Sequence, residues 1–273
     1  AMKRVALMVY LLSTASIVYG QQQSAVSDSL WNVSLQEVEV ISTRATRTTP
    51  VAFTNIGKEE LQKQNLGQDL PYLLSMTPSA ISTSDAGAGI GYTSIRVRGT
   101  DGTRINVTAN GIPLNDSESS QLYWVNMGDF ASSVESMQVQ RGVGTSTNGA
   151  GAFGATINMQ TENIGVKPFG AIDITGGAYD THKETFRFGT GLLGGHWGFQ
   201  GRLSNISSDG YIDRASSSLV SYFLQGGYFS DNTVVKLVTF NGKEKTYMAW
   251  DYASKADMEK YGRRYNPSGK YKD

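Results

Sequence analysis

From residue 163 onward the chain alternates apolar and polar side chains at every second position, which is the pattern of β-strands with two unlike faces. The apolar positions, in chain order, are Ile172 and Ile174; Phe186 and Phe188; Trp197, Phe199 and Leu203; Tyr222, Leu224 and Tyr228; and Val234, Val238 and Phe240. The polar positions between them include Asp173, Thr175, Thr185, Arg187, Gln200, Arg202, Ser221 and Gln225. Each predicted strand therefore has one apolar face and one polar face.

Two architectures satisfy this alternation. Strands of about ten residues, joined by short turns at one end and long loops at the other, are typical of an outer-membrane β-barrel whose apolar face meets lipid. The connections at 193–195 and 230–232 are tight, whereas those at 207–218 and from 242 onward are long. A soluble sandwich or barrel would instead bury the same apolar face. The pattern favours the membrane barrel but does not exclude the soluble one.

The composition narrows the possible functions. Lysine plus arginine and aspartate plus glutamate both number 24, so electrostatics give no reason to expect nucleic acid as a partner. The absence of cysteine excludes disulfides, thiolate zinc sites and cysteine nucleophiles, and two histidines far apart make a histidine-rich metal site improbable. The 31 glycines suit a β-rich chain with many turns.

The start of the chain has the features of an export signal. Lys3 and Arg4 precede an apolar run, and Gly20 is followed by a polar stretch, so residues 1–20 are predicted to be a cleaved signal peptide. No later run reaches the roughly 18 consecutive apolar residues of a transmembrane helix.

Residues 21–49 are predicted to be a flexible segment around one short strand. Val38 and Val40 alternate with polar residues within 35–43, and polar tracts flank that segment on both sides. Such a strand either docks on its own domain or adds to the sheet edge of another protein, and the pattern alone leaves these two alternatives equal.

Residues 50–162 are predicted to form a small mixed α/β domain. Helical patterns cover 58–66 and 69–76, with Asp69 as a possible N-cap and the leucines of both patterns expected in the core. Asn110-Gly111 is the dipeptide that favours a type I′ hairpin turn, and 134–139 is a predicted strand.

The segment 149–154 matches the glycine pattern of dinucleotide-binding loops. That reading requires a helix after the glycines, whereas Ala155–Gln160 has the pattern of a strand, so close backbone packing explains the glycines better. No Walker loop, zinc-protease motif or nucleophile elbow is present, and the sequence offers no positive support for an enzyme or a cofactor.

Four ordered segments, at 94–99, 110–114, 134–142 and 148–158, together resemble the plug domain of TonB-dependent outer-membrane receptors, and the tract Trp124–Phe130 fits the same resemblance. Residues 163–273 are similar to the first barrel strands of the same family. The plug-motif residues in this resemblance are Arg96, Arg98, Gly99, Arg141, Gly142, Gly149, Gly151, Gly154 and Asn158.

The resemblance implies a mainly β fold, in which a mixed α/β plug at 50–162 precedes strands at 163–273 that begin a 22-stranded antiparallel transmembrane barrel. It implies a location in the outer membrane of a Gram-negative bacterium, in contact with lipid. It also implies active uptake of a scarce extracellular ligand, such as an iron-siderophore, haem or cobalamin, driven by TonB.

Particular residues acquire expected roles from the same resemblance. The predicted TonB box, which would bind the periplasmic C-terminal domain of TonB by strand addition, comprises Leu35, Glu37, Val38, Glu39, Val40 and Ile41. The ligand-facing candidates in plug loops 85–93 and 115–124 are Tyr92, Asn115, Asp116, Tyr123 and Trp124. Arg98 and Arg141 either face barrel carboxylates or are ordinary surface arginines.

A count of strands qualifies this picture. Residues 163–273 provide room for about five strands, too few to close around the predicted plug, and an open sheet edge is not tolerated in lipid. We therefore expect the sequence to be part of a longer receptor and not to transport alone. The rival interpretation is a secreted or surface β-rich binding protein without TonB coupling.

Overall fold

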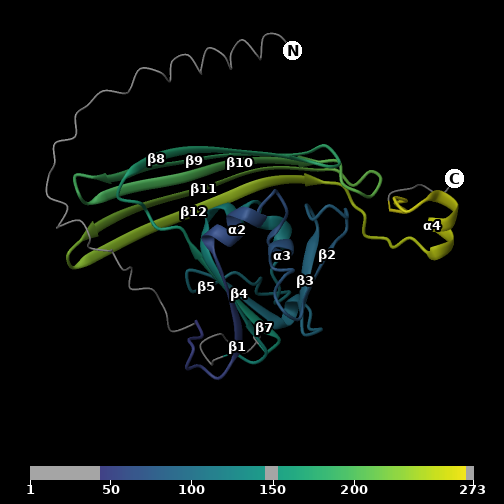
Figure 1. The fold of residues 1–273 in the computed structure, drawn as a ribbon, viewed down its shortest axis with the longest axis horizontal. Helices are drawn as coiled ribbons and strands as arrows, with labels where there is room; N and C mark the ends of the chain where they lie inside the picture. The colour runs from purple at the N-terminus through teal and green to yellow at the C-terminus, as the bar shows by residue number, and fades with distance from the viewer. Residues whose placement is uncertain (1–43, 145–152, 269–273) are drawn as a thin grey trace, which may run out of the picture. The chain divides into compact units, whose positions relative to one another are not determined.

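The computed structural model describes residues 44–144 and 153–268, and β-structure dominates both ranges (Figure 1). One five-stranded sheet has the strand order β1-β6-β7-β4-β5, and a second has the order β12-β11-β10-β9-β8. We call the region from residue 44 to 162 the plug region and the sheet of β8–β12 the wall. The mainly β fold with a mixed α/β N-terminal part is as predicted.

The plug region is built on the mixed sheet. Its strands are β1 (Ala52–Gly57), β4 (Ile105–Ala109), β5 (Ile112–Pro113), β6 (Val134–Arg141) and β7 (Ala155–Thr161). Strands β4 and β7 are parallel, and the other pairs are antiparallel. Strand β7 directly follows the glycine-rich segment, which confirms a strand where a dinucleotide site would need a helix.

Short elements surround this sheet. A separate hairpin is formed by β2 (Ala80–Ser84) and β3 (Thr93–Val97). The helices are α2 (Lys58–Gln64) and α3 (Leu70–Leu73), and the 3-10 turns are η2 (Gly102–Arg104), η3 (Trp124–Asn126) and η4 (Phe130–Ser133). Asp69 does occupy the N-cap position of α3, but its side chain makes no capping hydrogen bond there.

The helices bury their leucines against the mixed sheet, as the sequence predicts for most of them. Leu61, Leu73 and Leu74 lie in one apolar core together with the side chains of β4, β6 and β7. Leu66 is the exception, because it follows the end of α2 and is 51% exposed.

The Asn110-Gly111 turn is a type I′ hairpin, as predicted. Both residues have positive φ, 50° and 79°, and Ala109 pairs with Ile112 across the turn. The Asn110 side chain also accepts a hydrogen bond from the backbone N–H of Thr161 at 3.0 Å, which ties the hairpin to the end of β7.

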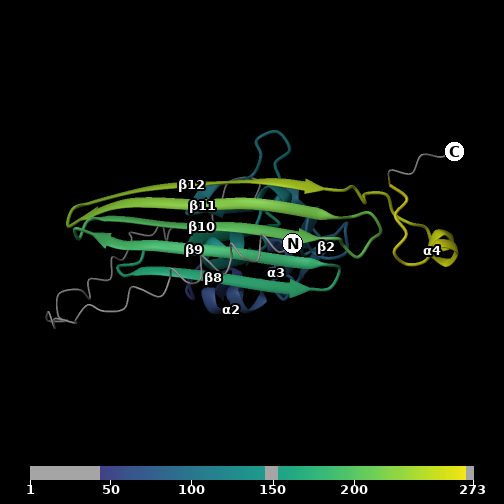
Figure 2. The same ribbon diagram turned by 90° about the horizontal axis from the view of Figure 1, so that it is seen from above.

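The wall is a simple antiparallel meander, and Figure 2 shows its five strands lying side by side in chain order. The strands are β8 (Pro168–Gly177), β9 (Thr181–Leu193), β10 (Trp197–Ser208), β11 (Ser217–Ser230) and β12 (Thr233–Thr246). The tight connections after β9 and β11 lie at one end of the sheet, and the longer one after β10 lies at the other end.

The two faces of the wall are inverted relative to a soluble sheet. Arg202 and Gln225, on the face toward the plug region, are each 3% exposed. Ile174 and Leu203, on the face turned away from it, are 74% and 49% exposed. The plug region thus covers the polar face and leaves the apolar face open, which is the arrangement expected of a membrane barrel and the reverse of a soluble sandwich.

Strand β12 corrects one assignment made from the sequence. The sequence places Val234, Val238 and Phe240 on the outer apolar face, but all three have register partners on the plug side of β11. Val238 packs against the plug core, and the Phe240 ring lies 5.0 Å from that of Phe130. The outer apolar positions of this strand are Val235 and Leu237, because their register partners are Tyr228 and Gly226. The apolar residues of β12 occupy both faces, so periodicity could not identify the outer one.

The tract after β12 contains one short helix, α4 (Lys255–Tyr261), which begins with a capping box between Ser254 and Asp257. Within the described ranges, none of the helices has the length and apolar character that a bilayer crossing demands.

Candidate functional site

A small hollow of about 140 Å³ lies where the two predicted ligand loops meet. Tyr92, Gln121, Tyr123 and Trp124 contribute to its lining, which contains no charged side chain. Tyr123 is 44% exposed and presents its ring to the surface, whereas Trp124 is only 6% exposed and belongs to the plug core. The structure therefore brings three of the five ligand-facing candidates together.

Contacts place the loop 85–93 at the long-loop end of the wall. The carbonyl oxygen of Ala86 accepts hydrogen bonds from the backbone N–H groups of Tyr211 and Ile212 at 2.9 and 3.1 Å. The ring of Tyr92 meets that of Trp250 edge-on, with 5.4 Å between centroids. The hollow thus opens beside the longer connections of the wall.

The other two candidates serve the local structure of their loop. The side-chain oxygen of Asn115 accepts from the backbone N–H of Val107 at 2.7 Å, and its amide donates to the carbonyl oxygens of Ile105 and Ser120. The carboxylate of Asp116 accepts from the backbone N–H groups of Glu118 and Ser119 at 3.1 and 2.7 Å. Neither residue lines the hollow.

Two carboxyl groups belong to or contact the loop 85–93: Asp85 begins it, and Asp69 contacts it at Gly89 and Thr93. Burial raises the pKa of Asp69 well above its usual value, although a 2.8 Å hydrogen bond from the Thr93 hydroxyl opposes this. Burial also raises the pKa of Asp85. The backbone N–H of Asp69 donates to the carbonyl oxygen of Gly89 at 2.8 Å, so Asp69 anchors the loop through both its main chain and its side chain.

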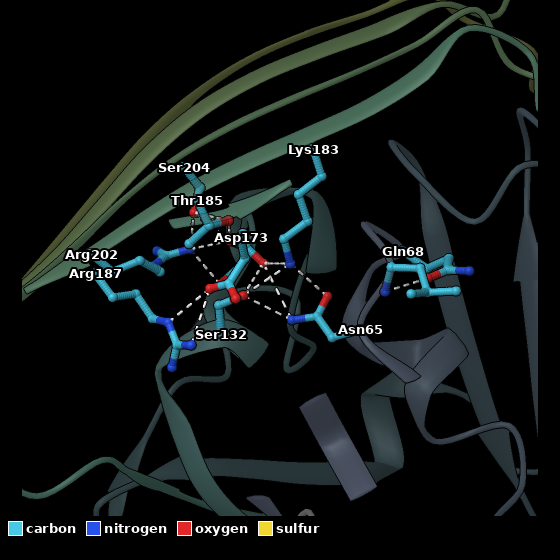
Figure 3. A network of polar contacts seen from close by, with 11 residues as sticks. Asn65, Gln68, Ser132, Asp173, Lys183, Thr185, Arg187, Arg202 and Ser204 are labelled. Carbon is cyan, nitrogen blue, oxygen red and sulfur yellow. Dashed lines mark hydrogen bonds and ion pairs between the residues drawn. The ribbon is translucent and has the colours of Figure 1, made fainter. Parts of the chain in front are cut away.

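The strongest polar contact between the plug region and the wall is made by Asp129. Its carboxylate lies 2.8 Å from the ammonium of Lys183 on β9 and 2.8 Å from the guanidinium of Arg202 on β10. It also accepts hydrogen bonds from the hydroxyl groups of Ser132 and Ser204. Figure 3 shows Lys183, Arg202 and Ser204 reaching from the wall toward this point. All three ionic side chains are almost fully buried.

The electrostatics of this cluster favour the charged carboxylate. Burial alone would raise the pKa of Asp129, but the positive charges of Lys183 and Arg202 outweigh burial and hold that pKa below its usual value. Asp129 adopts a left-handed backbone conformation, with φ 48° and ψ 25°, which Asp and Asn tolerate better than most residues.

Two further contacts extend the junction. Phe130 follows Asp129, and its ring packs edge-on against Phe223 and Phe240 of the wall, with centroids 6.0 and 5.0 Å away. Glu162 accepts a hydrogen bond from the side-chain amide of Gln200 on β10 at 2.9 Å and pairs with Lys58 on α2 at 3.1 Å.

The predicted plug-motif residues cluster although they are far apart in sequence. Arg98 and Gly99 form a two-residue turn, with φ 52° and 78°, closed by hydrogen bonds between Val97 and Thr100. A Cβ on Gly142 would lie 2.7 Å from the Arg98 guanidinium, and a Cβ on Gly154 would lie 2.3 Å from the Thr100 hydroxyl. Close approach to the chain at Thr100 and Arg104 therefore requires the glycine at 154, as inferred from the sequence, whereas Gly142 is favoured by its positive φ of 95°.

The remaining motif residues have local partners. Arg141 donates to the Thr54 hydroxyl at 2.7 Å, and the Asn158 side-chain oxygen accepts from Thr108 at 2.7 Å. Arg96 is exposed on β3. The ion pairs of Asp129 and Glu162 with the wall use carboxylates of the plug region. The pairing of Arg98 and Arg141 with barrel carboxylates stays a prediction.

Several predicted residues lie outside the described ranges. They are Gly149 and Gly151 and the six residues of the predicted TonB box, Leu35, Glu37, Val38, Glu39, Val40 and Ile41.

Sequence reasoning missed Asp129. It lies in the tract 124–130, which fits the plug resemblance, but no feature of that tract distinguishes Asp129 from its neighbours. The polar face of the wall offers a further clue. Lys183 and Arg202 sit on a face that alternation assigns to one side of a sheet, and buried cations require a carboxylate partner. Only the fold reveals which carboxylate that is. In the parts of the chain that the structure covers, no group of three or more His, Asp or Glu residues is arranged to hold a metal ion.

Comparison with known proteins supports the plug assignment directly. Residues 45–156 match the TonB-dependent Receptor Plug Domain family. These residues form a TonB-dependent receptor plug domain. No curated protein sequence matches the chain.

Solved receptors share the fold of the plug and wall together. The ferripyoverdine receptor of the outer membrane of Pseudomonas aeruginosa is 16% identical, with a TM-score of 0.61 over 74% of this chain and 26% of its own. The ferric yersiniabactin uptake receptor FyuA from Yersinia pestis is 16% identical, with a TM-score of 0.57 over 71% of this chain and 31% of its own. The ferric-catecholate import receptor Fiu from E. coli K12 is 15% identical, with a TM-score of 0.58 over 72% of this chain and 27% of its own. The chain therefore spans about a third or less of the length of these receptors.

Proposed function

We propose that this chain is the N-terminal part of a TonB-dependent outer-membrane receptor that takes up a scarce ligand. The observation that carries the proposal is the plug domain seated on the polar face of an antiparallel sheet whose apolar face is exposed. A soluble binding protein has no use for such an inverted sheet, because an exposed apolar surface of this extent favours aggregation in water.

The distribution of side chains on the outer face supports a bilayer location. Trp197 and Tyr228 are paired at the tight-turn end, with their ring centroids 4.9 Å apart. Aromatic side chains at this position suit the interface between lipid and water. Toward the other end, the outer face changes from Leu203 to Asn205 on β10 and from Val220 to Ser218 on β11.

Strands β8 and β12 have one unpaired edge each among the described residues. Because a bilayer cannot satisfy the hydrogen-bonding groups of an open edge, we infer that further strands of a longer receptor pair with both. Within that receptor, residues 1–20 would direct export and residues 35–41 would add a strand to the TonB C-terminal domain.

The hollow at Tyr92 and Tyr123 is the proposed contact point of the ligand on the plug. It lies at the long-loop end of the wall, which in outer-membrane barrels is the extracellular end. Its uncharged lining with exposed tyrosine suits a ring-shaped portion of a ligand held by stacking and a few hydrogen bonds.

The TonB interaction can be tested with a peptide that covers residues 33–48. We expect it to capture the purified TonB C-terminal domain. The Val40→Pro peptide should lose capture because it lacks a backbone donor, and the Glu39→Gln peptide should retain it. A known receptor box serves as positive control. Failure of the unaltered peptide, with that control working, would remove the TonB claim.

A further inference from the structure

The outer face of the wall contains a hollow of about 900 Å³ that the uptake function does not use. Ile172, Phe186, Leu203 and Tyr222 form one row across the sheet in direct register, and all four line the hollow. Val220 extends the apolar lining by one row toward the long-loop end.

The lining changes from apolar to polar within the hollow itself. The row that contains Val220 also carries Glu184 on β9, Asn205 on β10 and Lys243 on β12. The Asn205 amide donates to the Glu184 carboxylate at 3.3 Å. Across the sheet, Lys243 is about 14 Å from Glu184, because three strand spacings of roughly 4.8 Å separate β9 from β12.

A second lysine reinforces the positive charge on the β12 side. Lys245 is two residues beyond Lys243 and therefore on the same face, about 7 Å further along the strand. Both lysines are exposed. Their partners across the sheet, Val220 and Ser218, carry no charge that would neutralise them.

We propose that this hollow binds one anionic phosphate-bearing lipid, with an acyl chain against the apolar row and the phosphate between Lys243 and Lys245. The proposal rests on the bilayer location inferred above. An anionic lipid matches this lining in both of its parts. Its acyl chain is apolar like the row of Ile172 and Leu203, and its negative phosphate complements the two lysines. Lysines at such a boundary extend their stems over apolar surface and their ammonium groups to the headgroup.

The test uses the complete receptor that carries this chain, purified in mild detergent and exchanged with phosphatidylglycerol and phosphatidylcholine of identical acyl chains. Native mass spectrometry then counts the lipids that each receptor retains. We expect preferential retention of one phosphatidylglycerol. The Lys243→Gln/Lys245→Gln variant should retain it about 10- to 30-fold less, because each lysine near an anionic surface contributes about a three- to fivefold factor.

Two further variants sharpen the result. Lys167→Gln removes an exposed lysine just before β8, at the tight-turn end, and should leave retention unchanged. Val220→Trp fills the hollow without changing charge and should reduce retention of the acyl chain. Equal retention of both lipids, no effect of the double glutamine variant, or an equal effect of Lys167→Gln would each overturn the proposal.

Heat-modifiable gel mobility, measured on the same preparations, separates this inference from the proposed function. A receptor that inserts and folds but shows no lysine-dependent lipid retention contradicts only the lipid site. A receptor that is never found in the membrane contradicts the proposed function, and the lipid site with it. Retention of a second receptor copy in place of lipid would show the hollow to be a protein interface and would also overturn the proposal.

Discussion

Asp129 is the residue on which the junction between plug and wall depends most. Its carboxylate is 1% exposed and contacts two buried cations, so replacing it leaves Lys183 and Arg202 without a counter-charge. We expect Asp129→Asn to destabilise the plug by about 3–5 kcal/mol, because breaking a buried ion pair leaves the remaining charge buried without a partner. Urea unfolding of the plug, followed together with limited proteolysis, measures this loss.

Asp180→Asn is the matched control for that substitution. Asp180 also has a left-handed backbone, with φ 50°, and its carboxylate contacts His182 at 2.8 Å, but its side chain is 73% exposed. An exposed ion pair contributes little to stability, so this variant should unfold at the same urea concentration as the unaltered protein. Equal loss in both variants would mean that burial of the Asp129 cluster is not what stabilises the plug.

We expect the stability of the plug to depend on pH because of the buried carboxyl group of Asp69. Its folded-state pKa is raised, chiefly by burial, so its contribution to stability is fully present below the unfolded pKa of about 3.9 and is lost as pH rises through the folded value. Asp69→Asn cannot ionise. Relative to the unaltered protein, we expect this variant to gain stability as pH rises from about 4 toward neutral, as measured by unfolding at several pH values. A difference between the two proteins that stays constant across that range would contradict the assignment.

At the scale of elements, the loops of the plug depend on glycines that admit no side chain. A Cβ on Gly154, which precedes β7, would lie 2.8 Å from the carbonyl oxygen of Arg104, and backbone cannot yield as a flexible side chain can. We expect Gly154→Ala to cost about 1–3 kcal/mol of plug stability, the usual range for overpacking. Thermal unfolding of the plug checks the prediction.

Gly57 provides the comparison for this substitution. It ends β1, has an ordinary φ of −87°, and a Cβ there would meet nothing within 4 Å. Gly57→Ala should therefore change stability little. If the two alanine variants unfold alike, the close approach at Gly154 does not limit the packing of the loops.

At the scale of the whole molecule, the outer face of the wall decides between a membrane barrel and a soluble protein. Leu224→Arg places a charge within the apolar part of β11, whereas Ser218→Arg places the same charge on the same face near the long-loop end. In a bilayer, arginine costs about 2–4 kcal/mol near the midplane and about 0–1 near the interface. We expect only Leu224→Arg to lower the folded, heat-modifiable fraction of the complete receptor in the outer membrane. Equal tolerance of both arginines would argue against lipid on this face.

The sequence by itself determined the local elements of this protein. Alternation predicted the wall strands, Asn110-Gly111 predicted the type I′ turn, and the ordered glycine and arginine motifs predicted the plug family. These features follow from neighbouring residues, since strand periodicity and turn conformation depend on backbone sterics within a few positions.

Only the tertiary structure decided which face of each strand is covered and which charges meet. A period of two produces two faces but does not say which one meets the plug, and on β12 apolar residues lie on both. The pairing of Asp129 with Lys183 and Arg202 joins residues that are 54 and 73 positions apart. Contacts at such separations depend on how the sheets pack against each other. The order of side chains along the chain does not determine that packing, so these partners could not be deduced from it.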